Sequence, residues 1–274
     1  MTQARTSGPG TRLRRLGKLA ARFSFARQIL EFYQRIAVFQ QELYTKIPEQ
    51  WGGQGVIDPD KPLRAVLNLV VLLHHFPGFL SVVERDAPPP LAAAAQGLAS
   101  KDSAAWTASL EDYWARGGRD TNRPEPKEQF LSRAFLQPYA EFAAERIAIP
   151  PLLTTSRICP LCEAWPMLGV LRPEGDGGKK FLVCSFCGHE WEFRRILCPA
   201  CGEEDEKKLP VYVAEEFSHI RVEACETCKF SLRTIDLTKD GNAVPIVDDL
   251  AAIPLSLWAE ERGYTRLQPN LLGS

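Results

Sequence analysis

The sequence lacks a long apolar segment. A membrane-spanning helix needs about 18 to 20 predominantly apolar residues, and the longest candidate, Ala65–Leu73, is roughly half that length. Asn68 interrupts this candidate, and Pro77 closes the segment that follows it. We therefore expect a buried helix here and no membrane span.

An excess of positive charge is also missing, because 33 Lys and Arg stand against 34 Asp and Glu, for a formal net charge of -1. A protein that coats nucleic acid needs a surplus of basic side chains, so nucleic-acid binding is not expected. The first 30 residues are an exception, since they contain no acidic residue and seven basic ones: Arg5, Arg12, Arg14, Arg15, Lys18, Arg22 and Arg27. No apolar signal-peptide core follows them, so we expect a solvated basic helix or arm and a cytoplasmic location.

Signatures of catalysis are absent as well. The sequence has no phosphate-binding loop, no dinucleotide fingerprint and no Ser-His-Asp order typical of a hydrolase. The Gly-rich piece Gly175-Asp176-Gly177-Gly178 lies between strand-like runs and reads as a hairpin turn. We expect a protein that is not an enzyme.

The first 150 residues have helical periodicity and no cysteine. Apolar residues from Phe25 to Leu43 recur at alternating spacings of four and three, which predicts a helix that buries this stripe and ends before Pro48. Further helices are expected over 102–116 and 126–147, and Pro88-Pro89-Pro90 is expected to be a loop. Residues 1–150 are therefore predicted to form a helical bundle with a basic N-terminal arm.

After Pro150 the periodicity changes to short strand-like runs. The runs that we expect to form strands are Met167–Leu171, Phe181–Val183, Leu209–Val213, His219–Glu223 and Phe230–Ile235. A final amphipathic helix is expected from Asp248 to Arg262. We divide this half into a module over 151–196 and a second module over 197–274 that includes the helix.

All eight cysteines lie in this half, in four Cys-x-x-Cys pairs: Cys159/Cys162, Cys184/Cys187, Cys198/Cys201 and Cys225/Cys228. The first and third pairs each open a unit that a later pair closes, as in an internal duplication. Two cysteines separated by two residues can direct both sulfurs at one metal, and a second pair across a hairpin completes a tetrahedral S4 shell. Pairing first with second and third with fourth closes the shortest loops, so we expect two separate sites.

Two other interpretations of the cysteines are weaker. A disulfide framework belongs to secreted proteins, and thioredoxin-type chemistry needs one pair at a helix start rather than four pairs among strands.

An S4 shell accepts zinc or a single iron, so the identity of the metal stays open. His189, next to Cys187, is expected to surround a site rather than bind metal, and His219 has no partner that the sequence identifies.

The segment from Cys159 to Cys228 is acidic, with thirteen Asp and Glu against eight Lys and Arg. A nucleic-acid-binding zinc ribbon would present a basic face. A protein partner is the better expectation.

Several motifs of this half together resemble the FdhE family of formate dehydrogenase accessory proteins. The motifs are Cys184-Ser185-Phe186-Cys187, His189-Glu190-Trp191, Arg194-Arg195, Cys225-Glu226-Thr227-Cys228, Leu232-Arg233-Thr234-Ile235-Asp236, Asp248-Asp249-Leu250, Gly263-Tyr264 and Pro269-Asn270. The helical half is similar in layout only.

The resemblance implies an α+β fold: an N-terminal all-α helical bundle, two tandem rubredoxin-like (zinc-ribbon-like) metal-binding β modules and a C-terminal helix. It implies a cytoplasmic accessory protein, not an enzyme, that acts in the maturation of a molybdenum- or tungsten-dependent formate dehydrogenase and binds its catalytic subunit. The eight cysteines would bind two metal ions, with iron expected and zinc as the alternative. His189, Trp191 and Arg195 would shape the modules around them. A homodimer is left open.

A rubredoxin-like electron-transfer or redox-sensing protein is the alternative function. It would need a redox-active metal with a partly exposed sulfur, and a reversible one-electron couple would identify it.

Overall fold

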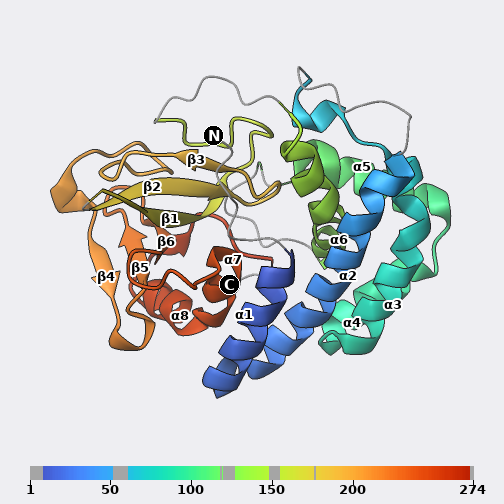
Figure 1. The fold of residues 1–274 in the computed structure, drawn as a ribbon, viewed down its shortest axis with the longest axis horizontal. Coiled ribbons are helices and arrows are strands. Elements are labelled where there is room, and N and C mark those ends of the chain that lie inside the picture. Colours follow the sequence, from blue (N-terminus) through green and yellow to red (C-terminus); the bar gives the residue numbers. More distant parts are fainter. Residues whose placement is uncertain are drawn as a thin grey trace.

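The N-terminal half of the chain is helical and the C-terminal half is built on one sheet, as the predicted fold class requires (Figure 1). The computed structural model describes residues 9–51, 61–117, 119, 127–147, 155–175 and 177–271. The predicted boundary at residue 150 lies outside these ranges. None of the helices within them is long and apolar enough to cross a membrane.

The helical half contains α1 (Pro9–Arg22), α2 (Arg27–Trp51), α3 (Phe76–Asp86), α4 (Pro89–Ala99), α5 (Ser103–Arg116) and α6 (Lys127–Ala144). The central helix α6 carries Phe135, whose ring lies 4.7 Å from that of Phe76 and 5.7 Å from that of Phe79. All three side chains are fully buried. Helix α5 begins as predicted, because the Asp102 side chain accepts a hydrogen bond from the backbone N-H of Ala105 and so caps the first turn.

Several predictions about this half were wrong. Helix α2 continues through Pro48 to Trp51, because a proline in the last turn removes only one backbone hydrogen bond, and Phe25 of the expected stripe is 55% exposed. Ala65–Leu73 is not a helix: Asn68 is extended, its side chain caps a separate 3-10 turn, and Val70 is 86% exposed. Pro89 and Pro90 are not a loop, because proline is favoured in the first turn of a helix and here begins α4.

The sheet contains β1 (Pro166–Glu174), β2 (Gly177–Cys184), β3 (Glu190–Glu192), β4 (Val211–Val213), β5 (Ile220–Ala224), β6 (Phe230–Asp236) and β7 (Thr265–Arg266). The strand order is β3-β2-β1-β6-β5-β4, with β7 beside β6. All five predicted strands are present, although β4 begins at Val211 rather than at Leu209. Strands β3 and β7 were not predicted. The β1–β2 hairpin places Glu174 opposite Gly177, so the predicted turn is where it was expected.

Strands β1 and β6 are parallel and join the two cysteine-bearing units into one continuous sheet. Gly169 of β1 lies opposite Thr234 of β6, and a Cβ atom at Gly169 would lie 2.4 Å from the Thr234 hydroxyl. The close approach explains a glycine inside a central strand. The division of the sheet half at residue 196 stays a prediction.

Two C-terminal helices, α7 (Pro245–Ala251) and α8 (Ile253–Glu261), replace the single helix expected over 248–262. The break lies at Ala252, directly before the helix start that contains Pro254. Helix α7 contacts β1, β6 and α1, and so lies between the sheet and the helical half (Figure 1).

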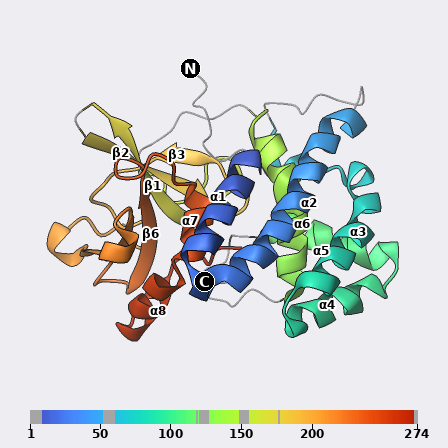
Figure 2. The same ribbon diagram turned by 60° about the horizontal axis from the view of Figure 1, so that its bottom comes forward.

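The basic helix α1 is solvated on one face only, because it packs between α2 and α7 (Figure 2). Arg14, Lys18 and Arg22 are exposed as predicted, and Arg5 lies outside the described residues. Arg12 pairs with Glu141 of α6 at 2.8 Å, and both side chains are 7% exposed. Arg15 binds both carboxylate oxygens of Asp248 in α7. Two of the arginines that made the segment look like a free arm therefore tie α1 to both halves of the molecule.

Candidate metal centres

The first four cysteines converge in the structure. We call the cluster formed by Cys159, Cys162, Cys184 and Cys187 centre 1. The Sγ–Sγ distances are 3.7 Å from Cys159 to Cys187, 3.3 Å from Cys162 to Cys184 and 3.6 Å from Cys162 to Cys187. All four side chains are buried.

The last four cysteines form a second cluster. Centre 2 contains Cys198, Cys201, Cys225 and Cys228. Cys198 and Cys228 lie 3.7 Å apart at their sulfurs, as do Cys201 and Cys225. The cysteines are therefore grouped as the predicted pairing of first with second and third with fourth requires.

Each Cys-x-x-Cys segment is followed by a residue in the left-handed backbone region. The four residues are Glu163 (φ 61°), Gly188 (φ 64°), Gly202 (φ 84°) and Lys229 (φ 60°). A left-handed residue reverses the chain after the second cysteine, and glycine adopts it at no steric cost. The two glycines could have been noticed in the sequence, whereas Glu163 and Lys229 carry no such signal.

Backbone hydrogen bonds hold these turns closed. The N-H of Glu163 donates to the Cys159 carbonyl at 2.9 Å, and the N-H of Lys229 donates to the Cys225 carbonyl at 2.8 Å. In centre 1 the N-H groups of Phe186 and Cys187 point at the Cys184 sulfur, each at 3.4 Å. The turn therefore directs backbone donors and both sulfurs toward the same point.

The sulfur geometry fits a tetrahedral metal ion. With metal–sulfur bonds of about 2.3 Å, the sulfurs of a tetrahedron lie about 3.8 Å apart. The distances in both clusters are close to this value, and each cluster offers four ligand atoms within 4.8 Å of one another. Either cluster could hold zinc or iron, because a tetrahedral S4 set suits both.

The acidities of the thiols differ within each cluster. Burial raises the pKa of Cys159 and Cys187 well above the ordinary range. At Cys184 hydrogen bonds from the neighbouring thiols outweigh burial, and the pKa lies well below that range. In centre 2 burial raises the pKa of Cys198 to about 11. A metal cation would allow all four sulfurs of a cluster to be thiolates together.

Centre 1 is embedded against the helical half. Arg64 donates to the Cys162 carbonyl at 3.1 Å, and Arg133 of α6 donates to the Ser185 carbonyl at 3.1 Å. Phe186, between the two cysteines of the second pair, packs its ring 5.2 Å from Trp114 of α5. The helical half therefore holds both Cys-x-x-Cys turns of centre 1.

Centre 2 is more open. Cys201 is exposed and Cys228 is partly exposed, while Cys198 and Cys225 are buried. Its two turns are linked directly, because the Thr227 hydroxyl donates to a Glu203 carboxylate oxygen at 2.5 Å. The two centres thus have the same donor set in different surroundings.

The three residues expected to shape the modules lie in different places. The Trp191 side chain is fully buried and donates from Nε1 to the Ser156 carbonyl at 2.8 Å. The His189 ring is buried and parallel to the Trp191 ring, with centroids 6.4 Å apart. Arg195 is exposed and lines the same cleft as Cys198 and Cys225 of centre 2.

A third cluster, which the sequence did not reveal, joins His219, Asp240 and Asp248. His219 Nε2 lies 2.9 Å from Asp248 Oδ1. Arg15 reaches both acids, at 2.8 Å for Asp240 and 2.5 Å for Asp248. A guanidinium already supplies the positive charge there, so this cluster is an ion-pair network rather than a metal site.

Comparisons with known proteins converge on one family. "FdhE, central domain" matches residues 158–195, and "FdhE, C-terminal domain" matches residues 196–272. A "Protein FdhE homolog" of Aquifex aeolicus is 25% identical over 270 residues, which is 95% of this chain and 94% of the relative. Another of Pseudomonas aeruginosa is 38% identical over 127 residues, which is 43% of this chain but only 40% of that relative.

The fold is also known from a solved structure. The crystal structure of the FdhE protein from Pseudomonas aeruginosa matches with a TM-score of 0.72 and 24% identity. The match covers 100% of this chain and 98% of that chain. The helical half is therefore part of the shared fold, although the family models match only the cysteine-bearing half.

Proposed function

Since residues 158–272 match the central and C-terminal domains of FdhE, we propose that this chain is an accessory protein in the maturation of a formate dehydrogenase. The observation that carries the proposal is the match of both cysteine-bearing domains to the family, together with two complete S4 clusters in them. The naming of the homologues as FdhE points to an accessory protein rather than an enzyme.

A more specific proposal concerns the partner protein and the bound metal ions. Its partner would be the catalytic subunit of a molybdenum- or tungsten-dependent formate dehydrogenase, met in the cytoplasm. The eight cysteines would bind two metal ions, which cross-link distant turns of the chain and, if they are iron, add a one-electron couple. Trp191 would stabilise the segment that leads to Cys159, because its Nε1 donates to the Ser156 carbonyl, and His189 would pack beside the Trp191 ring.

Co-expression tests the proposal. The catalytic subunit is produced with the wild-type chain, without it, and with a chain carrying Cys162→Ala and Cys201→Ala. We expect the wild-type chain to co-purify with the subunit and to raise formate dehydrogenase activity, and the double variant to do neither. Equal activity in all three preparations would contradict the proposal.

The exposure of Cys201 supports a second candidate, a rubredoxin-like electron-transfer or redox-sensing protein. Electron exchange is fastest where a ligand sulfur reaches the surface, and centre 2 provides one. Voltammetry of the iron-loaded chain separates the candidates, because only this one requires a reversible couple that a Cys201→Ser exchange shifts or abolishes.

A further inference from the structure

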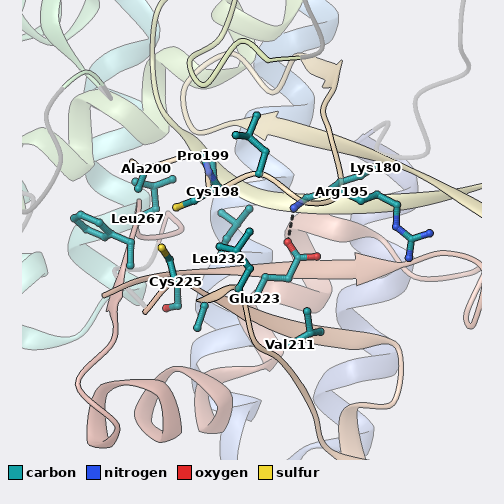
Figure 3. A pocket seen from close by; sticks show the side chains of 15 residues that line it. Lys180, Arg195, Cys198, Pro199, Ala200, Val211, Glu223, Cys225, Leu232 and Leu267 are labelled. Carbon is teal, nitrogen blue, oxygen red and sulfur yellow. Dashed lines mark hydrogen bonds and ion pairs between the residues drawn. The ribbon is translucent and has the colours of Figure 1, made fainter. Parts of the chain in front are cut away.

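A narrow cleft of about 40 Å³ lies between the loop that bears Cys198 and strands β4, β5 and β6 (Figure 3). Its walls are mainly apolar, formed by Leu197, Pro199, Leu209, Val211, Leu232 and Leu267. Two ligand cysteines of centre 2, Cys198 and Cys225, form part of the wall. The cleft is therefore shaped in part by the metal centre.

The charged groups inside the cleft already satisfy each other. Lys180 Nζ lies 2.5 Å from a carboxylate oxygen of Glu223, and the Lys180 side chain is 3% exposed (Figure 3). Because these two charges neutralise each other, the pair has no net charge that would attract an incoming ion. The interior consequently favours an apolar group, and its volume suits one aliphatic side chain.

Within the described part of the chain, the rim of the cleft exposes apolar side chains and a strand edge that no further strand covers. Val211 is 52% exposed and Val213 is 59% exposed, on the same face of β4. Strand β4 ends the sheet, and the hydrogen bond from the Ala224 N-H to the Pro210 carbonyl turns the backbone groups of 210 and 212 toward β5. By alternation, the N-H and C=O groups of Val211 and Val213 face away from the sheet.

A positive charge lines the same cleft as Val211. Arg195 lines the cleft with its guanidinium directed outward, and none of the carboxylates in the described ranges pairs with it (Figure 3). Its neighbour Arg194, in contrast, pairs with Glu204 at 2.8 Å. The rim thus combines exposed apolar side chains, unused backbone donors and acceptors, and an uncompensated cation.

From these features we infer that the cleft and β4 bind an extended segment of the partner polypeptide. The segment adds as a strand beside Val211 and Val213, inserts one aliphatic side chain into the cleft and places a carboxylate near Arg195. The inference rests on the proposed function in that the partner is the client enzyme subunit. Because Cys198 and Cys225 form the wall, loss of metal from centre 2 would deform the segment's binding site.

Direct binding tests the chemistry without the client. Three fluorescein-labelled peptides are titrated against the full chain: one alternates leucine and threonine beside two glutamates, one carries lysines instead of the glutamates, and one carries serines instead of the leucines. Only the first should bind, and Arg195→Glu or Val213→Lys should weaken it at least about tenfold. The control Val70→Lys replaces another exposed valine, in the helical half and 86% exposed, and should bind as the wild type does.

Equal binding of all three peptides, or binding that survives both rim variants, would overturn the inference. Co-purification of the client then separates the two proposals. If the Val213→Lys variant no longer co-purifies with the client while the Val70→Lys variant still does, both the accessory function and the cleft as docking site are supported. A chain whose Val213→Lys variant still captures the client contradicts the cleft as docking site and leaves the accessory function standing, whereas peptide binding without any client capture contradicts the accessory function alone.

Discussion

Arg64, in the 3-10 turn Leu63–Ala65 of the helical half, donates from Nε to the Cys162 carbonyl at 3.1 Å. Its guanidinium also lies over the Phe186 ring, 4.1 Å from the centroid, and donates to the Gly117 carbonyl at 2.6 Å. Cys162 and Phe186 belong to the two different Cys-x-x-Cys turns of centre 1. One arginine therefore connects both turns to the helical half.

Replacing this arginine should loosen centre 1 selectively. We expect Arg64→Ala to cost about 2 to 3 kcal/mol of stability, since it removes charge-assisted hydrogen bonds and a cation–π contact. Metal release to a chelator should become faster for one ion per chain and stay unchanged for the other. Arg116→Ala, on the exposed face of α5, is the control. Unchanged release of both ions from Arg64→Ala would refute the connection.

The buried pair between Arg12 and Glu141 should be essential to the attachment of α1. Burial alone would lower the pKa of Arg12. The negative charge of Glu141 outweighs this effect, so the pKa is raised above its ordinary value. Arg12→Met would leave a buried carboxylate without its cation and should cost about 3 to 5 kcal/mol in urea unfolding. Arg12→Met combined with Glu141→Met should recover most of the loss, because no charge remains buried. A single variant that unfolds like the wild type would show that the pair contributes little.

The contact between Gly169 and Thr234 makes the continuity of the sheet testable. Gly169→Ala should cost about 1 to 3 kcal/mol, because its Cβ would lie 2.4 Å from the Thr234 hydroxyl. Adding Thr234→Ala removes the clashing oxygen and should restore stability, whereas adding Thr234→Ser keeps the oxygen and should not. Gly97→Ala in α4 meets no atom within 4 Å and should be neutral or slightly stabilising. Equal rescue by alanine and serine would contradict the close approach.

Acid should weaken the contact between α1 and the loop before α7. Burial alone would raise the pKa of the Asp240 carboxyl group. The hydrogen bond from the Asn242 N-H and the interaction with Arg15 outweigh burial, so the pKa is lowered. A carboxylate with a lowered pKa in the folded state stabilises the fold above its unfolded pKa of about 4, and this stabilisation is lost as the pH falls through the lower folded value.

Wild-type stability should therefore fall more steeply below about pH 4 than that of Asp240→Asn, with a difference under about 1 kcal/mol because the side chain is partly exposed. Chemical unfolding at a series of pH values measures this. Glu111→Gln, an exposed substitution on α5, should leave the wild-type slope unchanged. Parallel slopes for the wild type and Asp240→Asn would contradict the assignment.

Local spacing made the cysteine clusters predictable. The pairs are close in sequence, and the shortest loops bring first to second and third to fourth, which is the arrangement observed. Five of the strands were predictable for the same reason, because alternation is a local property. Helix α5 likewise has its own capping residue in Asp102.

Long-range relationships could not be derived in this way. Arg12 and Arg15 look like solvated basic residues until Glu141 and Asp248, more than a hundred residues away, are placed beside them. The parallel pairing of β1 with β6 depends on a glycine whose partner Thr234 no periodicity identifies. Glu163 and Lys229 adopt backbone angles that their residue types disfavour, so only the fold reveals them.

The metal content of the chain purified without oxygen tests the central claim most directly. We compare the wild type with Cys159→Ala and Cys225→Ala, one in each cluster. The account predicts two ions per wild-type chain and one in each variant, with the larger stability loss in Cys159→Ala because centre 1 is buried against the helical half. Identical metal content in all three proteins would contradict the assignment of two metal centres.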